Sequence, residues 1–472
     1  MASASESETA YLSIEQAARL LRRREVSPAD LVEGALARIE RSNGKLHAFL
    51  TVLADQARRQ AKKAERGIRR GRARGPLYGV PISLKDNFQT RGIRTTAGSK
   101  ILADWVPDAD SNVASSLAAA GAIVVGKTNL HEFAYGITGE NPHYGSSRNP
   151  WAPDRISGGS SGGSAVATAT GMGFASVGTD TGGSIRIPSA LCGLVGLKPT
   201  YGLVSTQGVV PLGVSFDHVG PIARNVADAS ILLEAMAPRY PRGETRPDYR
   251  TLGRGRLRRF RLGLPRDYFL ERIDGEVREL VEAAAEKFAS LGARVEEVSL
   301  PRLVDAVDPA TNLIVAEASY YHESQGYFPA RAAEYGEDVR SHLEFGHQLL
   351  ALDYVRGVAA RREVIEDFQA AFERVDVILA PTSPITAPPV GEKQVRVAGE
   401  RESSTRAELL RLTRPANITG MPALSIPCGF THAGLPVGMQ LMAPRWAEAR
   451  LLAIAHTYEE ATEWAKRHPS LL

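Results

Sequence analysis

Apolar residues follow two patterns along this chain: they recur every three or four positions over long stretches, and they run together over short ones. The first pattern indicates amphipathic helices, and the second, where Gly or Pro bounds it, indicates buried strands. Helices are predicted at 13–24, from 27, at about 54–70, at 111–120, 165–172, 224–237, 274–291 and 447–464, and over most of 312–374. Strands are predicted at 80–84, 122–125, 174–177, 261–264, 294–298, 375–380, 423–427 and 437–441.

The order of these elements predicts the fold class. Helices and strands alternate along the chain, which implies an α/β fold. Ser13 and Gln16 have the spacing of a capping box, and Pro28 follows Ser27 at the start of the second helix. The helices within residues 10–72 are expected to form a helical cover. Irregular structure is expected in three places: loops and short strands at 185–188 and 193–200, a linker at 238–259, and a long loop at 381–405.

The composition is that of a globular protein. Of the 472 residues, 43% are hydrophobic, and no apolar run reaches the length of about 18 residues that a membrane helix needs. The N-terminal MASASESETA lacks the hydrophobic core of a secretory signal and is expected to be a frayed tail. Cys192 and Cys428 lie in apolar surroundings and are interpreted as buried thiols rather than a disulfide or a metal pair. We therefore expect a cytoplasmic protein.

The charge is weakly basic, with a formal net charge of +4. Arginines cluster at 22–24, 69–74 and 254–261, and basic clusters can bind nucleic acid. Each cluster is short and has acidic residues nearby, so we interpret all three as solvated surfaces. Neither a nucleic acid nor a membrane is expected as a partner.

Two glycine-rich segments with serine carry the most distinctive chemistry. They are GGSSGGS (158–164) and TDTGGS (179–184). Glycine lets the backbone approach a ligand closely, and paired glycines beside serines favour N–H groups that point into a shared space. The predicted helix and strand between the segments could bring two hydroxyls and several N–H donors into one site. The alternative interpretation is two flexible surface loops.

A lysine ends the predicted strand at 80–84. Lys85 is followed by Asp86 and Asn87. Two interpretations are open on this stretch alone. Lys85 is either a surface lysine paired with Asp86, or a desolvated base at the end of a buried strand.

Two short motifs match known patterns but lack their context. Residues 121–128, GAIVVGKT, fit the phosphate-loop pattern, yet the four variable positions form a predicted strand where the mechanism needs a loop. Residues 158–162, GGSSG, fit the nucleophile elbow of α/β-hydrolases, which needs a strand just before the serine. The segment at 149–157 holds two prolines instead, and the late histidines His432 and His456 have no distinctive surroundings. Both interpretations are disfavoured.

Several motifs together resemble the amidase signature family. They are GVPISLKDN (79–87), GKTNLHEFAYG (126–136), RNPW (148–151), GGSSGGS (158–164), GTDTGGSIRIP (178–188), GLKPTYG (196–202) and NITGMPALSIPCGF (417–430). The resemblance covers most of the chain, and Ser160 and Ser184 match the family's spacing. It implies one domain over residues 1–472, with a large mixed β-sheet covered by helices on both sides. Within that domain we expect the helical cover at 10–72, a signature core at 75–230 and a variable substrate-pocket region at 300–406.

The resemblance also implies a Ser–cis-Ser–Lys triad that needs no metal or cofactor. Ser184 is implied as the nucleophile, Ser160, after a cis peptide bond, as the proton relay, and Lys85 as the base. The N–H groups of Thr181, Gly182, Gly183 and Ser184 are implied as the oxyanion hole, and Ser161, Asp180 and Arg186 as residues that support the loops. Elementary chemistry agrees with these roles, because a serine needs a base within hydrogen-bond reach and burial lowers the pKa of a lysine.

The resemblance leaves the substrate open. The family includes free-standing amidases and the glutamine-hydrolysing component of glutamyl-tRNA amidotransferase, which this chain resembles in much of the core. The chain departs from that component at 317–325 and at Leu410, an expected acidic position, and both sites are implied to hold glutamine. We therefore expect a free-standing hydrolase of small acyl or aryl amides, with esters or carbamates as further substrates. The alternatives are the glutamine-hydrolysing subunit of a tRNA-dependent amidotransferase and a non-catalytic binding protein.

Aromatic residues in the variable region are candidates for an apolar substrate pocket. For each of them, ordinary core packing is an equally good interpretation. Homodimers are common in the family, but the sequence shows no interface. The candidate pocket residues are Tyr320, Tyr321, Tyr327, Phe328, Leu343 and Phe345, with Tyr135 as a weaker candidate.

Overall fold

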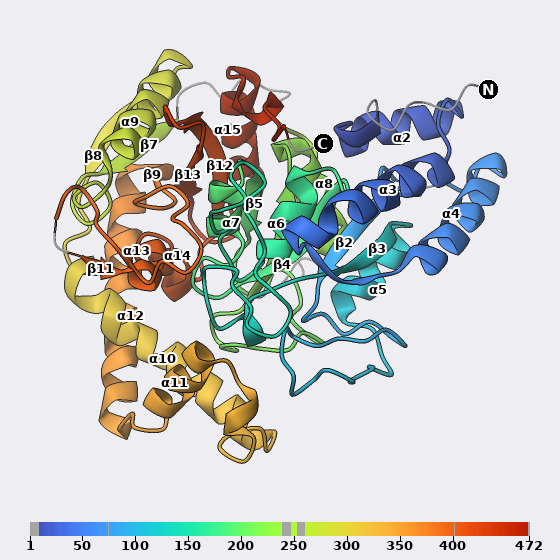
Figure 1. Cartoon of the computed structure of the whole chain (residues 1–472). Helices are drawn as coiled ribbons and strands as arrows, with labels where there is room; N and C mark the ends of the chain where they lie inside the picture. The colour runs from blue at the N-terminus through green and yellow to red at the C-terminus, as the bar shows by residue number, and fades with distance from the viewer. Residues whose placement is uncertain (1–8, 74, 238–246, 253–259, 401, 471–472) are drawn as a thin grey trace.

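A computed structural model of the chain describes residues 9–73, 75–237, 247–252, 260–400 and 402–470. An 11-stranded β-sheet runs through its centre (Figure 1). The strands are β1 (Phe49–Val52), β2 (Pro81–Lys85), β3 (Ile123–Thr128), β4 (Ala175–Asp180), β5 (Val195–Lys198), β6 (His218–Ala223), β7 (Arg261–Pro265), β8 (Arg294–Val298), β9 (Val377–Pro381), β12 (Ala423–Phe430) and β13 (Pro436–Met442). Their order in the sheet is β1-β3-β2-β4-β6-β5-β12-β13-β9-β7-β8.

The sheet is mixed and its centre is buried. β2 pairs in parallel with β3 and β4, whereas β4–β6 and β12–β13 are antiparallel. Every residue of β2, β4, β6, β9 and β13 is buried, as expected for strands covered on both faces. These features confirm the predicted α/β class with a large mixed sheet. Because strands from residues 49 to 442 share one sheet, we propose that the chain forms one domain.

Three helices lie near the N-terminus (Figure 1). They are α2 (Ile14–Arg23), α3 (Pro28–Leu46) and α4 (Ala54–Arg69), and two of them, α3 and α4, pack beside β2 and β3. The predicted capping box is present, since the Gln16 N–H donates to Ser13 Oγ at 3.1 Å and the Ser13 N–H donates to Gln16 Oε1 at 2.7 Å. A second box joins Ser27 and Asp30 at the start of α3. Local sequence therefore determines where these two helices begin.

The other helices that matter for the site lie in the core and in the C-terminal half. In the core they are α5 (Asn112–Ala119), α6 (Gly162–Ala169), α7 (Arg186–Leu191) and α8 (Val226–Met236). In the C-terminal half they are α9 (Gly275–Ser290), α10 (Leu303–Ser324), α11 (Glu337–Gly346), α12 (Ala351–Arg374), α13 (Thr405–Arg411), α14 (Arg414–Thr419) and α15 (Glu448–Glu460). In Figure 1, α10, α11 and the first part of α12 extend from the lower left of the molecule, on the opposite side from α2–α4.

Three sequence predictions of local structure were wrong. Residues 186–191 form helix α7, where loops and short strands were expected. Pro188 suggested a loop, but it lies in the first turn of the helix, where the N–H group that proline lacks would have no partner within the helix. β6 escaped prediction because it contains Gly220 and Pro221, which are rare inside strands. α10 begins nine residues before the expected helical region at 312, with Pro309 inside it.

The remaining predictions concern termini, linkers and membranes. No helix within the described ranges is long and apolar enough to cross a bilayer. Cys192 and Cys428 are both buried and unpaired. The arginines at 22–24 and 69–72 are exposed to solvent. Residues 1–8 of the predicted frayed tail, most of the linker at 238–259 and most of the cluster at 254–261 lie outside the described residues. Thr9 and Ala10, which belong to the same predicted tail, are buried.

Candidate active site

Lys85 is the last residue of β2, and its amine is buried inside the protein. The amine donates hydrogen bonds to Ser160 Oγ at 2.8 Å and to Thr179 Oγ1 at 2.7 Å. Thr179 lies near the end of β4, and parallel neighbours such as β2 and β4 present their carboxyl ends at one edge of the sheet. Burial lowers the pKa of Lys85 to about 7, although the nearby Asp217 and Asp180 oppose the shift. A neutral amine is therefore available near neutral pH.

The interpretation of Lys85 as a surface lysine paired with Asp86 was wrong. The Asp86 carboxylate lies 3.1 Å from the amine of Lys127 instead, and both side chains are fully buried. Lys127 belongs to β3, and three of the four variable positions of the phosphate-loop pattern, 123–125, lie in the same strand. The structure thus confirms that this motif lacks the loop a phosphate site needs.

Ser160 lies just before α6, after a cis peptide bond from Gly159, as the family resemblance implies. Residues 157–159 form no strand, so a nucleophile elbow is absent at this position. The N–H of Ser161 donates to the carbonyl of Ser184 at 3.2 Å. This bond joins the two glycine-rich segments, which confirms that they meet rather than form separate surface loops.

Asp180 and Arg186 hold the two ends of the segment that carries Ser184. Their side chains form two parallel hydrogen bonds of 3.1 Å, and both are fully buried. The same guanidinium donates to Asn417 at 2.6 Å and to Gln440 at 2.9 Å. Burial alone would raise the pKa of Asp180, but Arg186 and its other donors hold it below its usual range. The pair therefore remains ionised and fixes the turn between β4 and α7.

Among the described residues, four consecutive backbone N–H groups in that turn have no acceptor. The N–H groups of residues 181–184 donate no hydrogen bond within the part of the chain that the structure describes. Gly183 has a φ of +139°, and a Cβ there would lie 2.3 Å from Thr413 Oγ1. The hydroxyl of Thr413 in turn donates to the carbonyl of Gly182 at 2.6 Å. Free N–H groups held in a tight turn can bind an anionic oxygen.

The hydroxyl of Ser184 also has no hydrogen-bond partner in the described structure, and it borders a cavity of about 290 Å³. Beside it, Thr181 Oγ1 donates to the buried carboxylate of Asp217 at 2.5 Å. Burial raises the pKa of Asp217 to about 6, although this hydrogen bond and two backbone N–H groups favour its charged form. Asp217 therefore positions Thr181 and adds negative charge near Lys85.

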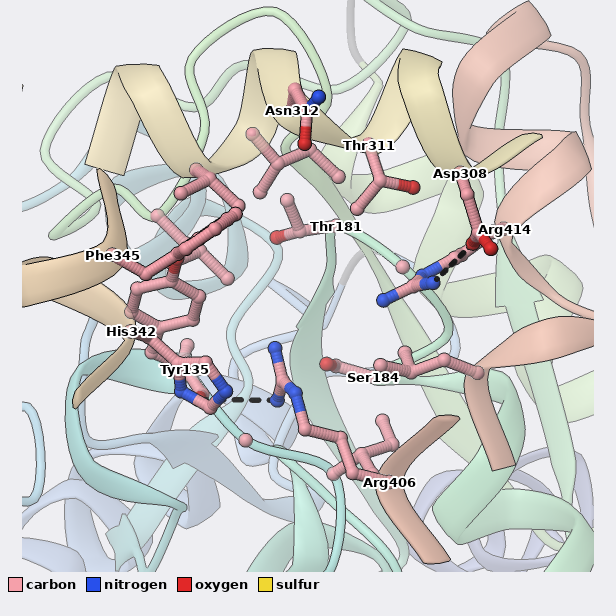
Figure 2. A pocket seen from close by; sticks show the side chains of 18 residues that line it. Tyr135, Thr181, Ser184, Asp308, Thr311, Asn312, His342, Phe345, Arg406 and Arg414 are labelled. Atoms are coloured by element: carbon pink, nitrogen blue, oxygen red, sulfur yellow. Dashed lines mark hydrogen bonds and ion pairs between the residues drawn. The ribbon is translucent and has the colours of Figure 1, made fainter. Parts of the chain in front are cut away.

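The cavity lies between the Ser184 turn and four helices (Figure 2). Its walls come from residues 134–137, the turn at 181–184 and helices α10, α11, α13 and α14, so part of the predicted region at 300–406 does line it. Tyr135 and Phe345 are in the lining, as expected. The full lining is Ala134, Tyr135, Gly136, Ile137, Thr181, Gly182, Ser184, Leu212, Asp308, Thr311, Asn312, Ile314, Val315, His342, Phe345, Arg406, Leu410 and Arg414.

Four of the expected aromatic residues, Tyr320, Tyr321, Tyr327 and Phe328, lie elsewhere, as does Leu343. Tyr320 is 73% exposed on α10, and Tyr321 packs against His322 and Tyr327. Phe328 is buried beside Tyr335 and His347. The sequence did not reveal which face of α10 meets Ser184, and that face carries Asp308, Thr311, Asn312 and Val315 instead of the tyrosines.

Four residues of the site were not found from the sequence. Thr179 lies within a motif that was noted but has no distinctive role there, and Asp217 follows no recognisable pattern. Arg406 and Arg414 are two of many arginines in the chain. The order of polar residues along the chain gives no signal for the cavity, because the fold alone brings these side chains to it.

The whole chain is similar to known proteins. A family model described as Amidase matches residues 30–452. A glutamyl-tRNA(Gln) amidotransferase subunit of Moorella thermoacetica is 40% identical over 488 aligned residues, covering 98% of this chain and 99% of that protein. A solved structure described as an amidase superposes with a TM-score of 0.88 at 37% identity, covering 95% of this chain and 100% of its own. The corresponding glutamyl-tRNA(Gln) amidotransferase structure from Thermotoga maritima gives 0.79 at 32% identity, covering 96% and 95%.

Proposed function

The chain belongs to the amidase family, and from this membership and the geometry around Ser184 we propose that it hydrolyses the C–N bond of a small amide. The proposed nucleophile is Ser184, the relay is Ser160 and the base is Lys85. The observation that carries the proposal is the 2.8 Å hydrogen bond between Lys85 and Ser160, made by a lysine whose pKa burial lowers to about 7. Close to its pKa, a substantial share of the lysine is neutral, and the neutral amine can serve as a general base.

The proposed reaction begins with proton transfer along the triad. Neutral Lys85 takes a proton from Ser160 while Ser160 takes one from Ser184, and the Ser184 oxygen bonds to the amide carbon. The carbonyl electrons move onto the oxygen, which the free N–H groups at 181–184 stabilise. The C–N bond then breaks, and the leaving amine receives the proton that Lys85 returns through Ser160.

Water completes the proposed cycle. It attacks the acyl-Ser184 ester and gives up one proton through Ser160 to Lys85. The bond between the acyl carbon and Ser184 breaks, the serine regains a proton, and a carboxylic acid leaves. The same steps act on esters and carbamates, so the triad alone does not select among these carbonyl compounds.

A simple assay tests this proposal. Release of aniline from an acyl anilide, or of ammonia from a primary amide, is measured for the purified chain and for Ser184→Ala. Activity in the wild type alone supports the proposal. Equal activity in both proteins contradicts the role of Ser184, and binding without turnover of any amide would favour a non-catalytic binding protein.

Glutamine hydrolysis within an amidotransferase is the second candidate function. It is favoured by the 40% identity over nearly the full length to the glutamyl-tRNA(Gln) amidotransferase protein of Moorella thermoacetica. Against it stand Leu410, which lines the cavity at an expected acidic position, and the closer superposition on the amidase structure. The purified chain should hydrolyse simple amides without partners if it is a free-standing enzyme. Glutamine hydrolysis that appears only with partner subunits would establish the second candidate.

A further inference from the structure

Two arginine side chains reach the cavity that Ser184 lines. Arg406 comes from α13 and Arg414 is the first residue of α14. Figure 2 shows both guanidinium groups directed into the space between α10 and Ser184, one from each side of the serine. The cavity next to the proposed nucleophile therefore holds two cations among apolar side chains, whereas the sequence led us to expect an apolar pocket alone.

Arg406 has no acidic partner in the described structure. Its hydrogen bond is a long one of 3.4 Å to the carbonyl of Tyr135, and its guanidinium lies 5.6 Å from the centre of the Tyr135 ring. The nearby acid that acts on Arg406 through its charge is Asp338. Its carboxylate is hydrogen-bonded to Nε2 of His131 at 2.6 Å. Burial and the nearby Arg414 lower the pKa of Arg406 to about 10, so it remains charged at neutral pH. A half-buried cation without an acidic partner is a binding position for an anion.

The rest of the cavity adds little negative charge. Arg414 forms an ion pair of 3.4 Å with Asp308, whose side chain is 87% exposed at the mouth. Asp308 is the one acidic side chain in the lining, against two guanidinium groups. Burial and the charge of Arg406 lower the pKa of His342 to about 3, so the imidazole is neutral. The lining therefore carries a net positive charge.

Two further polar atoms in the lining have no partner. The hydroxyl of Tyr135 and Nδ1 of His342 are buried without a hydrogen bond in the described structure. Buried polar atoms are normally satisfied, and exceptions mark places where a ligand or water completes the set. Their position beside Arg406 extends the polar wall that a ligand would meet (Figure 2).

We infer that the amide hydrolysed at Ser184 also carries a carboxylate, which Arg406 and Arg414 bind. This inference rests on the proposed function. A carboxylate is planar and accepts paired hydrogen bonds from a guanidinium, which suits both arginines. We expect no ammonium group on this substrate, because the lining offers no unpaired carboxylate to bind one. Asp308 is paired with Arg414, and Leu410 is apolar. An anionic amide is thus expected to bind better than glutamine, which is a zwitterion.

Binding to Ser184→Ala separates recognition from chemistry. Isothermal titration compares amides of matched size: glutaramate with valeramide and glutamine, and succinamate with butyramide. A second arm compares N-acetyl-β-alanine with N-propylacetamide, which moves the carboxylate to the amine side of the scissile bond. We expect the carboxylate to tighten binding by about 10- to 100-fold in at least one arm, the range for hydrogen bonds to charged groups. The comparison in which the carboxylate tightens binding shows whether the substrate carries it on the acyl side or on the amine side of the scissile bond.

The arginines are tested by substitution in the same background. Arg406→Met and, separately, Arg414→Met should each reduce the carboxylate advantage, the ratio of glutaramate to valeramide affinity in the same variant, at least about tenfold. Arg406→Lys should retain part of it. Arg396→Met is the matched control, because Arg396 pairs with Glu402 on the surface and does not line the cavity. Circular dichroism checks that each variant is folded.

The outcomes distinguish this inference from the proposed function. Equal binding of the charged and neutral amides in every arm overturns the inference, as does tighter binding of glutamine than of glutaramate. If the wild type hydrolyses neutral amides through Ser184 with no preference for the anions, the proposed function stands and the inference fails. If the anions bind through both arginines but are not hydrolysed, the recognition stands and the proposed hydrolysis fails.

Discussion

The amine of Lys85 lies 2.8 Å from the hydroxyl oxygen of Ser160, and neither side chain is exposed to solvent. The two residues are 75 positions apart in the chain. Lys85 ends a central strand, and Ser160 lies just before a helix that packs on the neighbouring strand β4. Their contact places a desolvated base against the relay serine of the proposed mechanism.

The state of Lys85 predicts how activity depends on pH. Because its pKa is lowered to about 7 by burial, the neutral amine predominates above that pH and the ammonium below it. Only the neutral amine accepts a proton, so kcat/KM should rise with pH, about tenfold per unit below pH 6, and level off above pH 8. A flat profile between about pH 6 and 9, with chemistry rate-limiting, would contradict the assignment.

Asp217 provides the control for that profile. Its charge favours the ammonium form of Lys85, so Asp217→Asn should lower the pKa of Lys85 and move the rising limb to lower pH. Asp217 itself has a pKa raised by burial to about 6 and titrates in the same range. If kcat/KM of Asp217→Asn no longer depended on pH, instead of rising at a lower pH, the pH dependence would come from the titration of Asp217 and not of Lys85.

Removing triad residues should reduce turnover without unfolding the protein. Ser184→Ala and Lys85→Ala should each lower kcat by at least about 10⁴-fold, and Ser160→Ala by about 10²- to 10⁴-fold. Ser290→Ala, an exposed serine at the end of α9, is the control and should match the wild type. Full activity in any of the three triad variants would remove the proposed mechanism.

Gly183→Ala tests the turn that holds the free N–H groups. A Cβ at this position would lie 2.3 Å from Thr413 Oγ1 and 2.6 Å from Ile187 Cδ1, so the turn must move. We expect a loss of about 10²- to 10³-fold in kcat, the typical effect of losing an oxyanion donor. Gly292→Ala is matched, because it has a φ of +99° but nothing within 4 Å of the added Cβ. A wild-type kcat in Gly183→Ala would show that the turn tolerates displacement.

The buried pair of Asp180 and Arg186 should matter for stability as well as activity. Asp180→Asn leaves the guanidinium of Arg186 without its charged partner, which should lower the free energy of unfolding by about 3–5 kcal/mol. Urea denaturation measures this change. Glu402→Gln, which breaks the exposed pair with Arg396, should change it by less than about 1 kcal/mol. Equal effects in the two variants would mean that the buried pair does not fix the turn.

The sequence predicted the fold best where local chemistry determines structure. The capping residues Ser13 and Ser27 placed two helix starts, and the apolar run before Lys85 placed β2 within one residue. It failed where tertiary contacts override local preference. β6 includes Gly220 and Pro221 but pairs along its whole length with β4, because neighbours on both sides bury it.

Some residues of the candidate site could be located from the sequence, and others depend on tertiary contacts alone. The proposed triad residues lie in motifs that the family resemblance located, and the structure brings Lys85 and Ser160 into contact. Arg406 and Arg414 have no sequence signal, because their role depends on how α13 and α14 fold over the Ser184 turn. Tyr320 was misplaced since apolar periodicity does not reveal which neighbour a helix face will meet.

The most direct measurement is to identify the residue that a serine-reactive fluorophosphonate modifies. The labelled protein is digested, and the modified peptide is found by mass spectrometry, in parallel with Ser184→Ala and Ser160→Ala. We predict one adduct on Ser184, none on Ser184→Ala, and slower labelling of Ser160→Ala, because Ser184 Oγ borders the cavity while Ser160 is fully buried. An adduct on Ser160, or undiminished labelling of Ser184→Ala, would contradict the account.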